Sequence, residues 1–283
     1  MNNEIKDLIR GACGGFLFGI PLIYTMEVWW IGSLVKPEKI IVALAIDFLV
    51  VFLLNRTAGF RTTQNVGVID AAMDSIEAIA IGIVCTTLML ILLREIDGEG
   101  SLNETVGKIM FESMPFTLGV ALANQVLSGD RYFQNEEQQQ KTSVRSKIKG
   151  ELHATISDIG ATLIGAMVVA FNIAPTDEVA MLAAAVTSPW LLAIMAFSLV
   201  ISYGIVFDSG FANQQKRMEQ KGIFQHPLSE TVVTYFIAVL TAIFMLWFFQ
   251  RLSFDDPWTV WLTHGLILGL PATIGGAAGR LAI

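Results

Sequence analysis

Long apolar runs separated by short polar loops make up most of this chain. Each run approaches the ~20 residues that a helix needs to cross the hydrocarbon core of a bilayer. The pattern predicts eight membrane-spanning helices, with these approximate bounds: 11–32, 38–55, 73–94, 106–127, 153–174, 184–206, 229–250 and 258–280. The predicted fold is therefore all-α, a polytopic transmembrane helical protein.

The basic residues test the predicted number of spans. The chain has 18 Lys and Arg, and with eight spans 13 of them fall in the loops and ends on one side and five on the other. Basic residues collect in cytoplasmic loops of membrane proteins. The bias therefore predicts a multi-pass protein of the bacterial inner membrane with both termini in the cytoplasm.

A proline motif occurs twice, as MPFTLGVALAN at 114–124 and as LPATIGGAAGR at 270–280. Weaker matches occur in the same order along the chain: Gly14 and Gly19 with Gly160 and Gly165, Gly59 with Gly210, and Glu77 with Glu230. These matches predict an internal repeat. Residues 1–127 form the first four-helix repeat, 128–152 a cytoplasmic linker, and 153–283 the second repeat. Because four spans return the chain to the same side, the repeats are parallel, and a pseudo-twofold axis along the membrane normal is expected.

The two prolines, Pro115 and Pro271, are expected to kink their helices. Proline removes one backbone hydrogen bond, and in lipid the freed carbonyl needs a partner in protein or water. Gly119 follows Pro115 on one helix face, and Gly275 and Gly279 follow Pro271 in the same way. Two interpretations stay open, which are tight packing of the two kinked helices against each other and a polar cavity or hinge. The copies diverge at Glu112, which corresponds to Leu268, and at Asn124, which corresponds to Arg280.

Four carboxylates are candidates for an ion pathway, because charged residues within a span are costly and usually line a pathway or pair with a partner. Asp47 lies in the middle of an apolar run, and Glu112 lies on the face of the Pro115 kink. Glu27 and Asp158 are expected towards the two mouths. The alternatives are a structural hydrogen bond for Asp47 and hydration at the interface for Glu27 and Glu112. Glu230 follows a serine and is interpreted as part of a helix cap.

Composition narrows the class of protein. The chain is 54% hydrophobic and 15% charged, with a mean hydropathy of +0.61 and a net charge of −7. These values favour a lipid bilayer as the partner and argue against nucleic acid. Cys13 and Cys85 lie within apolar runs, and neither metal-ligand spacing nor a catalytic or phosphate-binding motif is found in the sequence. We therefore expect no enzyme activity, no cofactor and no metal site.

Three segments carry a family resemblance: GIPLIYTMEVWW at 19–30, DAAMDSIEAIAIG at 70–82 and SYGIVFDSGFANQ at 202–214. They resemble a bacterial integral membrane protein family known as domain of unknown function 2391. The resemblance covers nearly the whole chain and implies a bacterial inner-membrane protein. It implies no reaction, ligand or catalytic residue.

Buried carboxylates in a duplicated membrane protein favour transport of inorganic ions or protons. The expected protein is a cation channel or a proton-coupled cation transporter. The second hypothesis is a non-transporting membrane subunit, sensor or scaffold, whose function resides in the 128–152 linker. A small-molecule exporter is the third, and a homo-oligomer is left open by the sequence.

Overall fold

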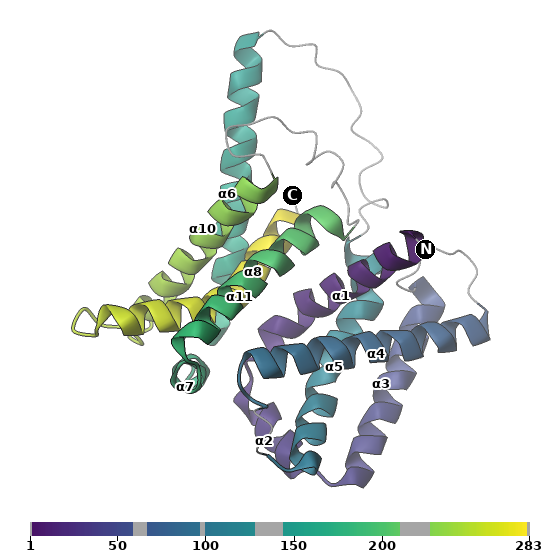
Figure 1. Ribbon diagram of the computed structural model, residues 1–283. Helices are drawn as coiled ribbons and strands as arrows, with labels where there is room; N and C mark the ends of the chain where they lie inside the picture. Colours follow the sequence, from purple (N-terminus) through teal and green to yellow (C-terminus); the bar gives the residue numbers. More distant parts are fainter. Residues whose placement is uncertain (1, 59–66, 97–99, 128–143, 210–226, 282–283) are drawn as a thin grey trace.

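The computed structural model describes residues 2–58, 67–96, 100–127, 144–209 and 227–281, and Figure 1 shows their arrangement. Every regular element in these ranges is helical, which confirms the predicted all-α fold. The helices are α1 (Asn2–Leu22), α2 (Met26–Leu34), α3 (Pro37–Ala58), α4 (Val68–Leu92), α5 (Leu102–Leu127), α6 (Val144–Ile173), α7 (Glu178–Ala185), α8 (Ser188–Tyr203), the π-helical turn η2 (Gly204–Asp208), α10 (Pro227–Phe248) and α11 (Trp258–Leu281). The part of the predicted linker at 128–143 lies outside the described residues, and 144–152 belong to α6.

Five helices in the described part of the chain are long and apolar enough to cross a membrane singly: α4, α5, α8 with η2, α10 and α11. Two more spans arise if α1 with α2, bent by 97°, and α6 with α7, bent by 89°, each count as one. These seven do not include α3, whose 22 residues carry Glu38, Lys39, Asp47 and Arg56. The chain is thus an integral membrane bundle with five to seven candidate spans in the described ranges.

Two of the predicted spans are not single helices. The run 11–32 breaks between α1 and α2, and the run 184–206 crosses the gap between α7 and α8. Pro21 lies in the last turn of α1, and Pro175 lies between α6 and α7. Because proline lacks the amide hydrogen and restricts the residue before it, it favours a helix end at both bends. Hydrophobicity predicted apolar helices in these segments but not the points at which the helices end and change direction.

Each helix that carries the repeated proline motif packs along the first helix of its own half, α5 along α1 and α11 along α6. Glycines make these contacts close: a Cβ placed on Gly14 would meet the carbonyl oxygen of Gly119 at 2.6 Å, and one on Gly275 would meet that of Gly165 at 2.4 Å. Glycine is required here because backbone touches backbone. The predicted packing of the two kinked helices against each other is therefore not found. Their small-residue faces contact α1 and α6 instead.

The two halves meet mainly through α1, which lies against α11 and η2, while α4 touches α8 (Figure 1). A twofold arrangement would place α5 against α6 in the way that α11 lies against α1. That pair is not among the substantial helix contacts of the described residues. The described contacts between the halves therefore do not confirm the predicted pseudo-twofold axis.

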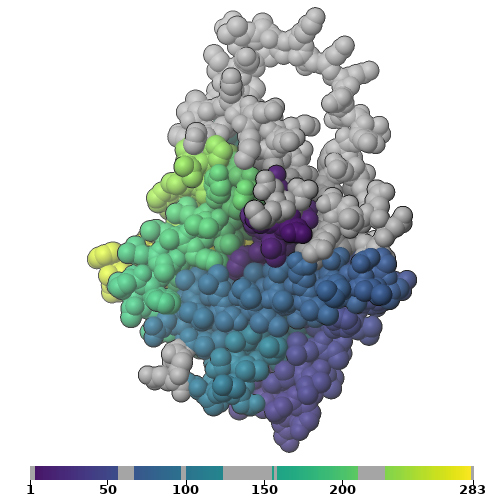
Figure 2. Space-filling view, turned by 45° about the vertical axis from the view of Figure 1, so that its right-hand side comes forward, coloured from purple at the N-terminus to yellow at the C-terminus, as the bar shows by residue number. Residues whose placement is uncertain are grey.

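The outward faces of the helices are apolar. Helix α4 lies across the face shown in Figure 2, and its exposed side chains include Ile69, Met73, Ile76, Val84 and Leu88. A continuous apolar surface of this kind is rare in proteins that dissolve in water. It is the surface expected where a helix faces lipid.

Candidate functional site

Asp47 lies in the middle of α3 and is 4% exposed. The hydroxyl of Thr117, on α5, lies near its carboxyl group. The Oδ2 atom of Asp47 has no hydrogen-bond partner among the described residues. Asp47 is therefore buried among the helices, with one of its oxygens unsatisfied.

Glu112 lies on α5, three residues before Pro115, and is 1% exposed. Its Oε1 atom also has no hydrogen-bond partner among the described residues. Its backbone carbonyl accepts a hydrogen bond of 3.3 Å from the hydroxyl of Thr86 on α4. Glu112 is thus a second buried carboxyl group with an open oxygen.

The chemistry of both groups follows from their burial. A buried polar atom without a hydrogen bond is costly, and a buried ionised carboxylate costs far more unless a cation compensates it. Such a group is therefore neutralised by a proton or by a bound cation. Asp47 and Glu112 can each hold and release one or the other.

The other two predicted carboxylates lie elsewhere. Glu27 is exposed in the first turn of α2, and Asp158 is buried on α6. The four candidates are therefore carried by four different helices, α2, α3, α5 and α6. Within the described ranges no group of three or more acidic, His or Cys side chains converges to hold a metal ion. The structure thus places Asp47 and Glu112 in the first half and Asp158 in the second.

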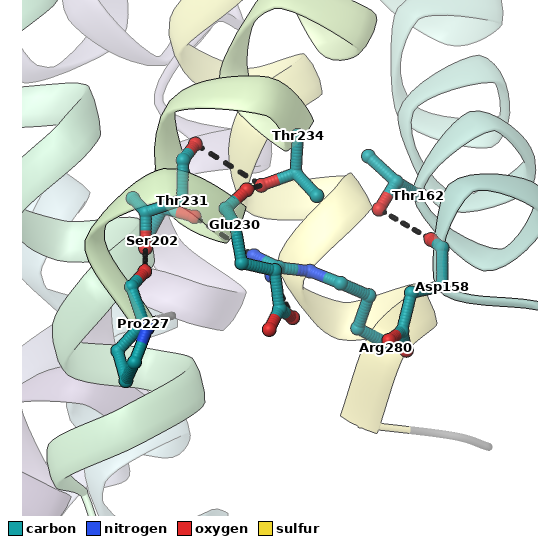
Figure 3. A network of polar contacts seen from close by, with 8 residues as sticks. All are labelled: Asp158, Thr162, Ser202, Pro227, Glu230, Thr231, Thr234 and Arg280. Atoms are coloured by element: carbon teal, nitrogen blue, oxygen red, sulfur yellow. Dashed lines mark hydrogen bonds and ion pairs between the residues drawn. The ribbon is translucent and has the colours of Figure 1, made fainter. Parts of the chain in front are cut away.

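A buried ion pair that the sequence analysis did not predict lies in the second half. Figure 3 shows Arg280 reaching from α11 towards Glu230 of α10 and Ser202 of α8, with Asp158 of α6 beside it. Arg280 Nη1 donates to Glu230 Oε1 at 3.0 Å, and Nη2 donates to Ser202 Oγ at 3.2 Å. The Arg280 side chain is 0% exposed. The pair ties three helices of the second half together at one end of the bundle.

The interpretation of Glu230 as a capping residue explains why this pair was missed. Glu230 does lie in the first turn of α10, but its carboxylate is engaged by Arg280. One signal was available in the sequence, since Arg280 replaces the Asn124 of the first proline motif. From the sequence, a single basic residue at the end of an apolar run is interpreted as a solvated group. The contact of Arg280 with Glu230 is seen only in the folded structure.

The backbone carbonyl that Pro271 leaves without a helical donor accepts a hydrogen bond from the first half. Proline at 271 leaves the carbonyl of Ile267, four residues earlier, without its helical donor. That carbonyl accepts a hydrogen bond of 2.7 Å from the hydroxyl of Tyr24, a buried residue between α1 and α2. The prediction that the freed carbonyl finds a partner in neighbouring protein is confirmed for Pro271. The bend of one half is thereby joined to the kink of the other.

Comparison with known proteins places the chain in one family. No curated protein and no solved structure matches it. Residues 7–283 match a family described as "Putative integral membrane protein (DUF2391)". This match confirms the resemblance drawn from the three sequence segments. The chain belongs to the DUF2391 family of integral membrane proteins.

Proposed function

We propose that this protein is a transporter or channel that moves protons or small cations across the bacterial inner membrane, and not an enzyme. The observation that carries the proposal is the pair of buried carboxyl groups, Asp47 and Glu112, each with an oxygen that lacks a hydrogen-bond partner among the described residues. Ionisable residues at membrane depth are characteristic of ion pathways and proton relays. A proton or a cation supplies the interaction that each open oxygen lacks.

The broken helices support the same proposal. One bent helix pair occurs in each half, α1 with α2 and α6 with α7. Short or interrupted hydrophobic segments at corresponding places in two halves mark the binding region in many transporters. The start of α1 and the end of α11 lie at the same end of the molecule (Figure 1), as a cytoplasmic location of both termini requires.

Similar helix contacts in the two halves support the proposed duplication. Gly14 contacts Gly119 at the α1–α5 crossing, and Gly165 contacts Gly275 at the α6–α11 crossing. In each case a glycine four residues after the helix proline meets the first helix of the same half. The duplication would place an ion pathway between or within two related four-helix units.

Reconstitution into proteoliposomes tests the function. Wild-type protein is expected to carry a flux of protons or monovalent cations, measured with a pH-sensitive or cation-sensitive dye inside the vesicles. Asp47→Asn and Glu112→Gln keep the size of each side chain but remove its ability to ionise, and each is expected to abolish most of the flux. Glu38→Gln changes an exposed carboxylate on the same helix as Asp47 and serves as the matched control. An unchanged flux in both pathway variants contradicts the site, and no flux of any ion in the wild type contradicts the function.

A non-transporting membrane subunit is the second proposal, because the surroundings of Asp47 are closely packed. A Cβ on Gly82 would meet the Thr117 hydroxyl at 2.3 Å, so α4 and α5 touch beside the carboxylate. In this case Asp47 serves as a structural hydrogen-bond acceptor, and a partner docks on the 128–152 linker. Deleting the linker separates the two proposals, because a pathway within the helices survives the deletion and a docking function does not.

A further inference from the structure

A polar pocket of about 320 Å³ opens at the turn between α4 and α5. Its described lining residues are Arg94, Glu95, Ile96, Gly100, Glu104, Thr105 and Lys108. The guanidinium of Arg94 lies 5.5 Å from the centre of the Trp190 ring, on α8 of the other half. Among the described lining residues, Glu95 and Glu104 are the carboxylates that contact Lys108.

Lys108 occupies the position that a free cation would take. Its ammonium nitrogen lies 3.2 Å from Glu104 Oε1 and 3.7 Å from Glu95 Oε2. It also donates a hydrogen bond of 3.1 Å to the backbone carbonyl of Glu95. Carboxylate and carbonyl oxygens are the ligands that hard cations prefer. The oxygens around Lys108 are thus of the kind that bind cations, and the cation that they hold here is the ammonium of the protein itself.

A line of ionisable residues leads from this pocket into the protein. Glu104, Lys108 and Glu112 are spaced by four residues and so share one face of α5. Exposure falls along the line, from 39% and 13% for the side chains of Glu104 and Lys108 to 1% for Glu112. Glu112 ends the line with its unpartnered Oε1. Glu95 contacts Lys108 from the turn that follows α4.

We propose that this pocket is the mouth through which small monovalent cations reach Glu112, and that the Lys108 ammonium closes it. A cation that displaces the ammonium takes its place between Glu95 and Glu104, on the same face of α5 as Glu112. The inference names the entrance and the charge of the ligand for the proposed transport function, on which it rests. Anions are excluded from this mouth, because the carboxylates of Glu95 and Glu104 stay in the pocket when the Lys108 side chain moves away.

Thiol labelling tests the mouth without measuring transport. Glu112→Cys is introduced into the full-length protein in detergent micelles, and its rate of reaction with a small cationic methanethiosulfonate is measured. Lys108→Met in the same protein is expected to raise this rate about tenfold, because it removes the plug and leaves two uncompensated carboxylates to concentrate cations. Lys108→Arg keeps the positive charge and is expected to leave the rate low. The parent chain, whose Cys13 and Cys85 are both buried, supplies the blank.

Two controls make the result specific. Ser198→Cys places a thiol at a buried position of α8 in the other half, and Lys108→Met is expected to leave its labelling rate unchanged. Lys108→Met is expected not to raise the rate at which an anionic methanethiosulfonate reacts with Glu112→Cys. The proposal is overturned if Lys108→Met leaves the labelling rate of Glu112→Cys unchanged. It is also overturned if Lys108→Met raises the labelling rate of Ser198→Cys by the same factor, or if it raises the rate of the anionic reagent at position 112 as much as that of the cationic one. None of these outcomes depends on whether vesicles show a flux, so the mouth and the transport function fail separately.

Discussion

The hydrogen bond from Tyr24 to the carbonyl of Ile267 predicts a specific coupling between two distant substitutions. Tyr24→Phe removes the hydroxyl and leaves a buried carbonyl without a donor, because Pro271 has no amide hydrogen to offer. An unsatisfied buried carbonyl costs about 1–3 kcal/mol, and hydrogen bonds between membrane helices tend towards the lower end of this range. We therefore expect Tyr24→Phe to lower the free energy of unfolding by about 1–2 kcal/mol.

Pro271→Ala changes this expectation. Alanine restores the amide hydrogen at 271, which can donate to Ile267 as in a regular helix, so the Tyr24 hydroxyl is no longer the only donor available to that carbonyl. Tyr24→Phe made together with Pro271→Ala should then cost little. The double-mutant cycle is expected to give a coupling of about 1 kcal/mol, measured by unfolding the purified protein in mixed micelles of increasing denaturing detergent.

Tyr235→Phe is the matched control for this cycle. Tyr235 is equally buried, but its hydroxyl has no hydrogen-bond partner among the described residues, so its loss should leave stability nearly unchanged. The reasoning is refuted if the Tyr24 and Pro271 substitutions are additive. It is also refuted if Tyr235→Phe costs as much as Tyr24→Phe.

Two further predictions concern the stability of the second half. Arg280→Met should lower the free energy of unfolding by about 3–5 kcal/mol, because it leaves the Glu230 carboxylate buried without this partner. Adding Glu230→Gln should recover part of the loss. If the pair were exposed, neither effect would appear in the same detergent titration. Gly275→Ala should lower the free energy of unfolding by about 1–3 kcal/mol, since its Cβ would meet the Gly165 carbonyl oxygen at 2.4 Å. Gly160→Ala is the control and should be neutral or stabilising, because a Cβ there meets nothing within 4 Å. Equal effects of the two substitutions would contradict the described packing.

Much of the helical content was predictable from hydrophobicity, because the free energy of transfer into lipid depends on composition more than on tertiary contacts. The bends were not, since Pro21 and Pro175 end or redirect a helix only where a neighbouring element accepts the new direction. The glycine faces that follow Pro115 and Pro271 were predictable from the sequence, but the helices on which these faces pack were not.

The sequence also could not predict which residues of α1 and α6, the first helices of the two halves, occupy equivalent positions. The sequence match pairs Gly14 with Gly160, whereas Gly165 makes the contacts in the second half that Gly14 makes in the first. Glycine spacing is similar in both registers, and only the carbonyl that each glycine meets distinguishes them. Asp47 and Glu112, by contrast, were found as candidates from the sequence, because each is a carboxylate within an apolar run.

The pairing of Arg280 with Glu230 could not be found in this way, because it depends on a fold that brings the starts and ends of different helices together.

The glycine contacts between α1 and α5 and between α6 and α11 have a mechanical consequence. Where backbone lies directly on backbone, neither helix can slide or rotate without a steric clash, so each such pair behaves as a rigid beam. The halves meet through the contact between α1 and α11, next to the Tyr24 hydrogen bond. We therefore expect any change of shape that accompanies the proposed transport to move one half against the other at this contact, while each glycine-packed helix pair moves as a unit.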